Sequence, residues 1–399
     1  MDVFKIEKEI LKLCGIERYP SKQKKHVRDA LMIWHHAVMI YGIFASISYI
    51  LSANDILGIA ESVSAGGTVL FMLIKFSVFC GRSDELFGFM DEIEQLNEKY
   101  TDLPNSKEIL SNANKLLTKI MTPIKFGCIV TPIFYILKPL SSDVFNYLIY
   151  DIQPSCKTLL KVKYFYNVTQ SPTYELTYLF ETYETCLSCF LIYATSSIFS
   201  NFCLNINAHF EILRNSINNM KIDEFVKYHV EILEITYKLN SFYRPLILAQ
   251  YSIGIVLFAV LGLSVVAADN WLQNLIPIFH TYGALIYVAV FSYVSQKIMD
   301  SSEALCDEAY NIDKDYLMVI MIAQKKLRFT TGFFEVSFDT YSIMLSRSWS
   351  FIALLNSFPY RGVPLKARFI YDETKSPAYE LTFLLQVYAT VTVSGIIES

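Results

Sequence analysis

The sequence predicts an all-α integral membrane protein with seven transmembrane helices and a cytoplasmic N-terminus. Hydrophobic residues make up 53% of the 399 residues and charged residues only 18%, below the roughly 25% charge of a typical soluble protein. The mean hydropathy is +0.34. Seven segments are long and apolar enough to cross about 30 Å of hydrocarbon. The net charge of −4 argues against a nucleic-acid partner.

The seven predicted spans follow one another along the chain. Four of them contain no Asp, Glu, Lys or Arg, and each of the other three contains two such residues. In order, the spans cover residues 30–53, 57–80, 120–140, 185–210, 245–268, 271–296 and 337–358. An eighth apolar segment, residues 379–397, lies in the tail beyond them.

The distribution of basic residues predicts the orientation. Lysines and glutamates between residues 5 and 12 interrupt any apolar core that a signal peptide needs. With the N-terminus inside, the inner segments hold 23 Lys and Arg residues and the outer segments seven, in agreement with the positive-inside rule. This topology is inverted relative to G-protein-coupled receptors. It places the sequon Asn167-Val168-Thr169, a predicted glycosylation site, in an outer loop.

Short motifs from residue 171 onward resemble insect odorant receptors. Residues 171–178 (SPTYELTY) resemble the entry to the fourth helix of that family. Further similar stretches are Ala309-Tyr310, residues 320–328, Thr330-Thr331-Gly332, Phe338 and residues 346–355 (SRSWSFIALL). With the span count, orientation and loop lengths, the resemblance covers about residues 1–357.

The resemblance implies a subunit of an odorant-gated, non-selective cation channel. Such a subunit forms a heterotetramer with the olfactory co-receptor in the plasma membrane of sensory neuron dendrites. The co-receptor has a much longer second cytoplasmic loop, whereas only about 35 residues separate Phe210 from Pro245 here. We therefore expect an odorant-tuning subunit, with a volatile odorant and membrane lipid as its other partners.

Two other functions remain as alternatives. One is a gustatory-type chemoreceptor channel of the same superfamily. The more distant one is a secondary transporter, which would need broken helices around a midplane site. Gly66-Gly67 in the second span is the only sign of such a break.

Aromatic side chains gather towards the outer ends of the third, fourth and sixth spans. They offer apolar contact to a volatile ligand, although an interfacial aromatic belt explains them equally well. The resemblance favours a pocket, because it places the odorant site among the second, third, fourth and sixth helices. The candidate ligand-binding residues are Phe134, Tyr135, Tyr174, Tyr178, Phe279, His280 and Tyr282. For His280, ordinary packing is the alternative.

Ionisable residues near the spans have simple interpretations. Glu175, Glu181 and Glu184 recur at helical spacing near the mouth of the fourth span, which a solvated outer rim would explain. Lys75 and Lys125 lie near the inner ends of their spans, where their side chains would snorkel to the interface.

The seventh span carries the candidate pore residues. Ser350, Ala353, Leu354 and Ser357 form one helical stripe, and Arg347 lies one turn earlier. The resemblance places the seventh helix around the pore, where water would hydrate Arg347 and a hydrophobic constriction would gate by dewetting. An ordinary packing face is the alternative.

No catalytic motif is present. The sequence lacks a phosphate-binding glycine loop, His-Glu-x-x-His and Gly-x-Ser-x-Gly. His35 and His36 project to different sides of a helix. Cys186 and Cys189 have metal-like spacing but lie in a charge-free span with no His beside them. We therefore expect no enzymatic activity, no metal site and no cofactor.

The tail divides the chain into residues 1–357, the seven-helix channel subunit, and residues 358–399. Residues 376–390 repeat residues 171–185, with nine of fifteen positions identical. The repeat begins mid-protein and stops inside a helix, unlike a repeat array. We interpret it as a fusion with part of a second receptor's outer loop and fourth-helix entry. A genuine eighth helix is the alternative.

Overall fold

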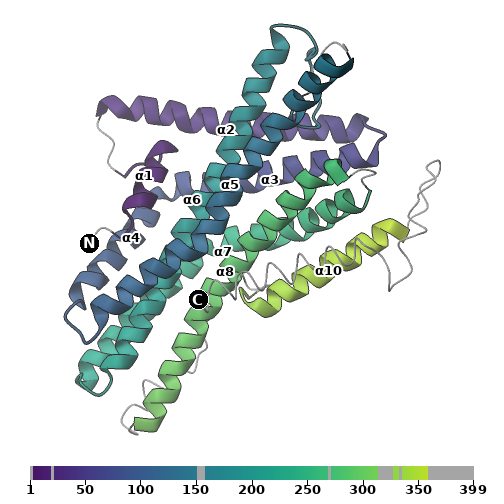
Figure 1. Ribbon diagram of the computed structural model, residues 1–399. Helices are drawn as coiled ribbons and strands as arrows, with labels where there is room; N and C mark the ends of the chain where they lie inside the picture. The colour runs from purple at the N-terminus through teal and green to yellow at the C-terminus, as the bar shows by residue number, and fades with distance from the viewer. Residues whose placement is uncertain are drawn as a thin grey trace.

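The computed structural model describes residues 3–18, 22–150, 158–267, 271–312, 327–331 and 335–357, and these ranges are almost entirely helical. One isolated antiparallel bridge, Thr330 with Glu335, is the only β pairing within them. The helices, shown in Figure 1, are α1 (Lys5–Leu13), α2 (Lys22–Ser52), α3 (Ile56–Gly81), α4 (Ser83–Lys99), α5 (Ser106–Tyr150), α6 (Thr173–Ser216), α7 (Ile222–Ala267), α8 (Trp271–Ile312) and α10 (Phe338–Ser357).

The predicted spans correspond to helices. Six of the described helices, α2, α3, α5, α6, α7 and α8, are long and apolar enough to cross a membrane, and they contain the first six predicted spans. The 20-residue helix α10 occupies the place of the seventh. The predicted fold class, an all-α membrane protein, is therefore confirmed, and the orientation stays a prediction.

Four helices are much longer than a bilayer requires. α5, α6, α7 and α8 have 45, 44, 46 and 42 residues, so each is roughly 65 Å long at about 1.5 Å per residue. Figure 1 shows α5 and α6 running side by side. The short connection predicted between Phe210 and Pro245 is itself largely helical: α6 continues to Ser216 and α7 begins at Ile222, with Pro245 inside it.

The extensions of these helices stay helical because one face remains apolar. In α7, Phe225, Tyr228, Ile232 and Leu239 are fully buried at the three-, four- and seven-residue spacing of an amphipathic helix. On the polar side, Lys99 of α4 forms an ion pair with Glu231 at 2.5 Å, Lys238 with Glu92 at 3.4 Å and Arg214 of α6 with Glu308 of α8 at 3.5 Å.

The core is built around α6, which packs against α1, α2, α3, α4, α5, α7 and α8. Its ring Phe199 stacks on Phe291 of α8 with centroids 4.3 Å apart and packs against Tyr243 of α7 at 4.8 Å. Aromatic pairs of this kind add to the stability that burial of their area provides. This cluster joins three of the four long helices, α6, α7 and α8.

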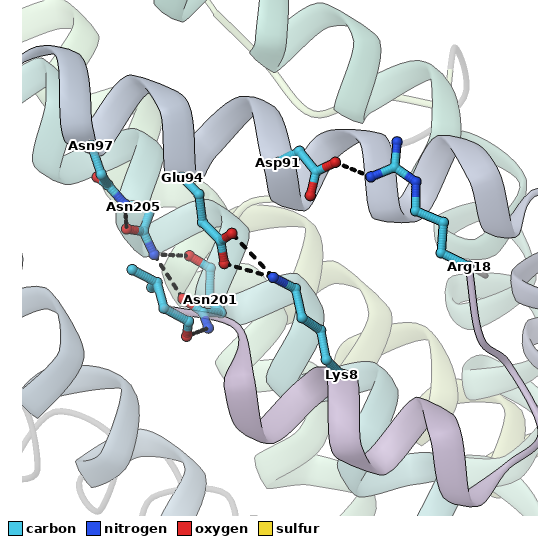
Figure 2. A network of polar contacts seen from close by, with 8 residues as sticks. Lys8, Arg18, Asp91, Glu94, Asn97, Asn201 and Asn205 are labelled. Atoms are coloured by element: carbon cyan, nitrogen blue, oxygen red, sulfur yellow. Dashed lines mark hydrogen bonds and ion pairs between the residues drawn. The ribbon is translucent and has the colours of Figure 1, made fainter. Parts of the chain in front are cut away.

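The N-terminal helix α1 and the residues that flank it are fixed to α4 and α6 by polar contacts (Figure 2). Lys8 Nζ donates to both carboxylate oxygens of Glu94 at 2.8 and 3.1 Å, and Arg18 pairs with Asp91. The amide of Asn201 on α6 donates to the backbone oxygen of Val3 at 3.1 Å. These contacts anchor a helix whose apolar side is buried through Phe4 and Leu11.

Helix α3 is continuous through Gly66 and Gly67. A Cβ at Gly66 would lie 2.8 Å from Cβ of Ser46 on α2, and one at Gly67 would lie 2.8 Å from Cδ2 of Leu257 on α7. The two glycines therefore allow neighbouring helices to approach closely, as small residues do in membrane proteins. The only sequence sign of a broken, transporter-like helix is thus a packing feature.

Candidate functional site

A cavity of about 200 Å³ lies between α3, α5, α6, α7 and α8. Most of its wall is apolar, with Phe71, Met72, Ile192, Leu257 and Phe258 among the lining residues. An apolar cavity of about 150 Å³ holds benzene, so this one accommodates a small aromatic or aliphatic molecule. Its helices include the four that the sequence analysis expected, together with α7.

Four of the predicted ligand residues line the cavity: Tyr135, Phe279, His280 and Tyr282. His280 connects two helices across the wall. Its Nε2 lies 3.5 Å from Oγ1 of Thr68 on α3, and its Nδ1 lies 3.4 Å from the hydroxyl of Tyr135 on α5. Whether each hydroxyl donates or accepts its hydrogen bond depends on the tautomer of the His280 ring.

The other three predicted ligand residues do not line the cavity. Phe134 stacks on Phe279 with centroids 5.1 Å apart and so supports the wall from behind. The hydroxyl of Tyr178 donates to the backbone oxygen of Ile136 at 2.6 Å. The ring of Tyr174 lies 6.1 Å from that of Tyr178, in the first turns of α6.

Glu181 and Glu184 are buried, with 0% and 1% of their surface exposed, whereas Glu175 is exposed. The interpretation of all three as a solvated rim is therefore wrong for Glu181 and Glu184. The two glutamates are buried by tertiary contacts. Residues of the segment before α6 fold back over this part of the helix, and α2 packs beside it.

Glu181 ties the segment between α5 and α6 to the helix. Its Oε2 accepts from the backbone nitrogens of Leu159 and Leu160 at 2.7 and 3.4 Å, and its Oε1 accepts from the hydroxyl of Tyr164 at 2.9 Å. Burial and the Glu181 carboxyl raise the pKa of Tyr164, so the hydroxyl stays protonated and donates. Because Leu160 lines the cavity, Glu181 positions one wall of the site.

Glu184 is the carboxyl of the cavity wall. Its head group lies against Gly42 of α2, where a Cβ would clash with it. In the part of the chain that the structure describes, Oε1 of Glu184 has no hydrogen-bond partner, and the same holds for Oγ of Ser188 and Nε2 of Gln250, both also in the wall. In the sequence, the one indication of this buried carboxyl is that a glutamate stands at the edge of an apolar span.

Lys75 lies beneath the cavity and is 1% exposed, so its interpretation as a snorkelling residue is wrong. Its Nζ lies 4.3 Å from the ring centroid of Phe71, 4.6 Å from that of Tyr287 and 5.0 Å from that of Phe291, and 3.5 Å from Oγ1 of Thr195. Cation–π contacts of this kind are worth up to about 2 kcal/mol when desolvated. Phe71 and Tyr287 also line the cavity.

Helix α10 presents two distinct faces. Tyr341, Met344 and Ser348 are buried against α7 and α8, and Oγ of Ser348 donates to the backbone oxygen of Ile255 at 3.3 Å. Arg347 and Ser350 are exposed and point away from that packing face. The remaining pore candidates lie in the last turns of α10, and their side chains are outside the described part of the structure. They are Ala353, Leu354 and Ser357.

Asn167 lies in the segment before α6 and is itself exposed. Its Oδ1 accepts from the backbone nitrogen of Thr169 at 2.9 Å and from its hydroxyl at 2.7 Å. The tail of residues 358–399, including the repeat, lies outside the described residues.

The fold and the cavity together define a multi-pass helical membrane protein with an apolar cavity between its helices. The chain belongs to the 7tm odorant receptor family, whose sequence model matches residues 55–349. It is 22% identical to odorant receptor 82a of Drosophila melanogaster over 358 residues, which cover 82% of this chain and 92% of the relative. It is 23% identical to odorant receptor 10a of the same species over 220 residues, covering 47% and 53% of the two chains. These relatives are receptors, not enzymes.

Solved structures agree with the fold. The insect olfactory receptor OR5 from Machilis hrabei in complex with eugenol matches with a TM-score of 0.76 and 14% identity, covering 88% of this chain and 97% of that one. The same receptor in a second structure matches with a TM-score of 0.74 and 13% identity over the same shares. The predicted membership in the insect odorant receptors is confirmed.

Proposed function

We propose that the chain is the odorant-binding subunit of a ligand-gated, non-selective cation channel in the plasma membrane. It assembles with the olfactory co-receptor as a heterotetramer and sets the odorant specificity of the complex. The observation that carries this proposal is the apolar cavity between α3, α5, α6, α7 and α8, in a chain that belongs to the odorant receptors.

The cavity suits a volatile ligand. Its wall supplies apolar burial and aromatic faces, and the hydroxyl of Tyr135 and the ring of His280 supply polar contacts, as small-molecule sites commonly do. OR5, which shares the fold, has been solved with eugenol. A ligand opens the channel to the extent that the open state binds it more tightly than the closed state.

The exposed face of α10 supports a pore role. Arg347 is exposed, and a guanidinium at membrane depth needs water or a partner. A water-filled pore shared by four subunits would supply that water. We place the hydrophobic gate at Leu354, which would close the pore by dewetting.

The topology and the chain ends complete the proposal. The N-terminus is cytoplasmic, which puts the α5–α6 segment outside and makes Asn167 a glycosylation site. Residues 1–357 form the channel subunit. Residues 358–399 are a partial copy of a second receptor and are dispensable.

Expression in oocytes with and without the co-receptor tests the function. We expect odorant-evoked cation currents only when both chains are present. Odorant-evoked, coupled solute uptake without channel conductance would refute the proposal in favour of transport.

A further inference from the structure

The cavity reaches the surface of the molecule between α5 and α8. Of the residues that line it, only Phe126 on α5, which is 65% exposed, and Phe279 on α8, which is 37% exposed, are exposed. The lining residues that α3, α6 and α7 contribute are all buried or half-buried. The side of the cavity between α5 and α8 is therefore the one that lies nearest to the surroundings of the protein.

Two glycines leave open space on this side. Gly127 of α5 and Gly283 of α8 both line the cavity, and a Cβ added to either would have nothing within 4 Å beyond its own helix backbone and chain neighbours. The third lining glycine, Gly254 of α7, differs, because its Cβ would lie 3.4 Å from Cε of Met344 on α10. A glycine that allows helices to pack closely has a neighbour at that position. Gly127 and Gly283 have none among the described residues, so they border a gap.

A pair of stacked rings marks one edge of the gap. Phe134 of α5 and Phe279 of α8 have ring centroids 5.1 Å apart. Because α5 and α8 are the third and sixth spans, they run in opposite directions. Gly127, before Phe134, and Gly283, after Phe279, therefore lie on the same side of the stack, about two turns and one turn from it. The two helices touch at the stack and leave space beside the glycines.

The side chains around the gap are those of a surface that faces lipid. The apolar part of α5 extends to Leu137. From residue 126 to residue 137, every exposed side chain of α5 is apolar, and these are Phe126, Ile129, Ile133 and Leu137. A molecule that offers the apolar area of a Phe side chain is enriched in hydrocarbon over water by roughly tenfold to a hundredfold. The bilayer beside the gap is thus a richer source of apolar ligand than water is.

We propose that apolar ligands enter and leave the cavity from the hydrocarbon of the bilayer, through the gap between α5 and α8 beside Gly127 and Gly283. The inference rests on the proposed function, because it concerns the ligand of the same cavity. The segment before α6 covers another side of the cavity, where Leu160 lines it and donates its backbone nitrogen to Glu181 at 3.4 Å. Entry there would break hydrogen bonds of the Glu181 carboxyl, whereas apolar side chains border the gap.

Fluorine NMR of the purified chain in phosphatidylcholine nanodiscs tests the route, with 4-fluorotoluene as the probe. Saturation transfer gives the rate at which bound probe exchanges with probe in the lipid, and signal areas give the bound fraction. Gly127→Leu and Gly283→Leu should each slow the exchange by roughly tenfold or more, because the added side chain obstructs the gap. The bound fraction should stay within about threefold, because a narrower route slows entry and exit alike.

Gly88→Leu is the matched control. Gly88 of α4 is also half-buried with open space at its Cβ, but it is not among the residues that line the cavity. The exchange rate in this variant should equal that of the parent chain. Gly127→Ala, a smaller change at the gap, should slow the exchange by less than Gly127→Leu does.

The outcomes separate the route from the channel function. An exchange rate that stays at the parental value in both leucine variants would overturn the proposal. A bound fraction that falls tenfold without slower exchange would also overturn it, because the glycines would then shape the cavity and not its entrance. Absence of bound probe in the parent chain would refute the cavity as a ligand site, and the route with it. Slower exchange in the two variants, in a chain that gives no odorant-evoked current with the co-receptor, would refute the channel function and uphold the route.

Discussion

Removing the Glu181 carboxyl should release the segment that closes the cavity. In Glu181→Leu, the backbone nitrogens of Leu159 and Leu160 and the hydroxyl of Tyr164 lose their acceptor. Each buried group left unpaired costs about 1–3 kcal/mol. We take the lower end, since Leu160 is half-buried and a hydroxyl can rotate, and obtain about 3 kcal/mol.

A loss of about 3 kcal/mol corresponds to a roughly hundredfold rise in local opening, at 1.4 kcal/mol per tenfold. Hydrogen exchange of the Leu159 amide measures this opening directly. Tyr164→Phe removes only one of the three bonds and should raise the exchange by less than about tenfold. Because Leu160 lines the cavity, odorant potency should fall in Glu181→Leu.

If the Leu159 amide stays as protected in Glu181→Leu as in the parent chain, Glu181 does not hold the segment in place. Potency that falls while the protection stays would also contradict the prediction, because the effect on the ligand is argued to pass through the segment. Glu175→Leu, which changes an exposed carboxyl of the same helix, is the matched control for both measurements.

Three further changes test other parts of the molecule. Lys75→Met should leave the free energy of unfolding unchanged or raise it by about 1–2 kcal/mol, since well-packed apolar groups often replace buried charges without loss; a fall larger than that of the exposed control Lys125→Met would show that the ammonium is needed for stability. Leu354→Asn should raise the current without odorant by wetting the constriction, and an unchanged basal current would move the gate elsewhere. Truncation after Pro359 should leave co-receptor-dependent currents intact, and their loss would make the tail functional.

The number and order of the membrane helices could be predicted, because long apolar runs have few other stable forms in a membrane protein. The helix lengths could not. The charged stretch at the start of α7 reads as a loop by mean hydropathy, yet its buried face of Phe225, Tyr228 and Ile232 packs it as a continuation of the span.

Which aromatics face the cavity could not be predicted either. In a membrane, lipid-facing and core-facing positions are both apolar, so hydropathy does not determine the rotation of a helix. Tyr135 and Tyr282 face the cavity whereas Tyr174 does not. The burial of Lys75 and Glu181 depends on rings and backbone groups far away in the chain, and no local pattern contains that information.

The location of the odorant site is the central claim, and the division of the predicted aromatics into two sets tests it most directly. The measurement is the order of potency of a set of odorants on Tyr135→Ala, Tyr282→Ala and Tyr174→Ala, each with its surface expression quantified. In the two variants of the cavity wall we expect a changed order, with potency losses of roughly tenfold or more for the affected odorants. In Tyr174→Ala we expect the parental order. A parental order in both cavity variants, together with altered tuning in Tyr174→Ala, would place the odorant outside this cavity.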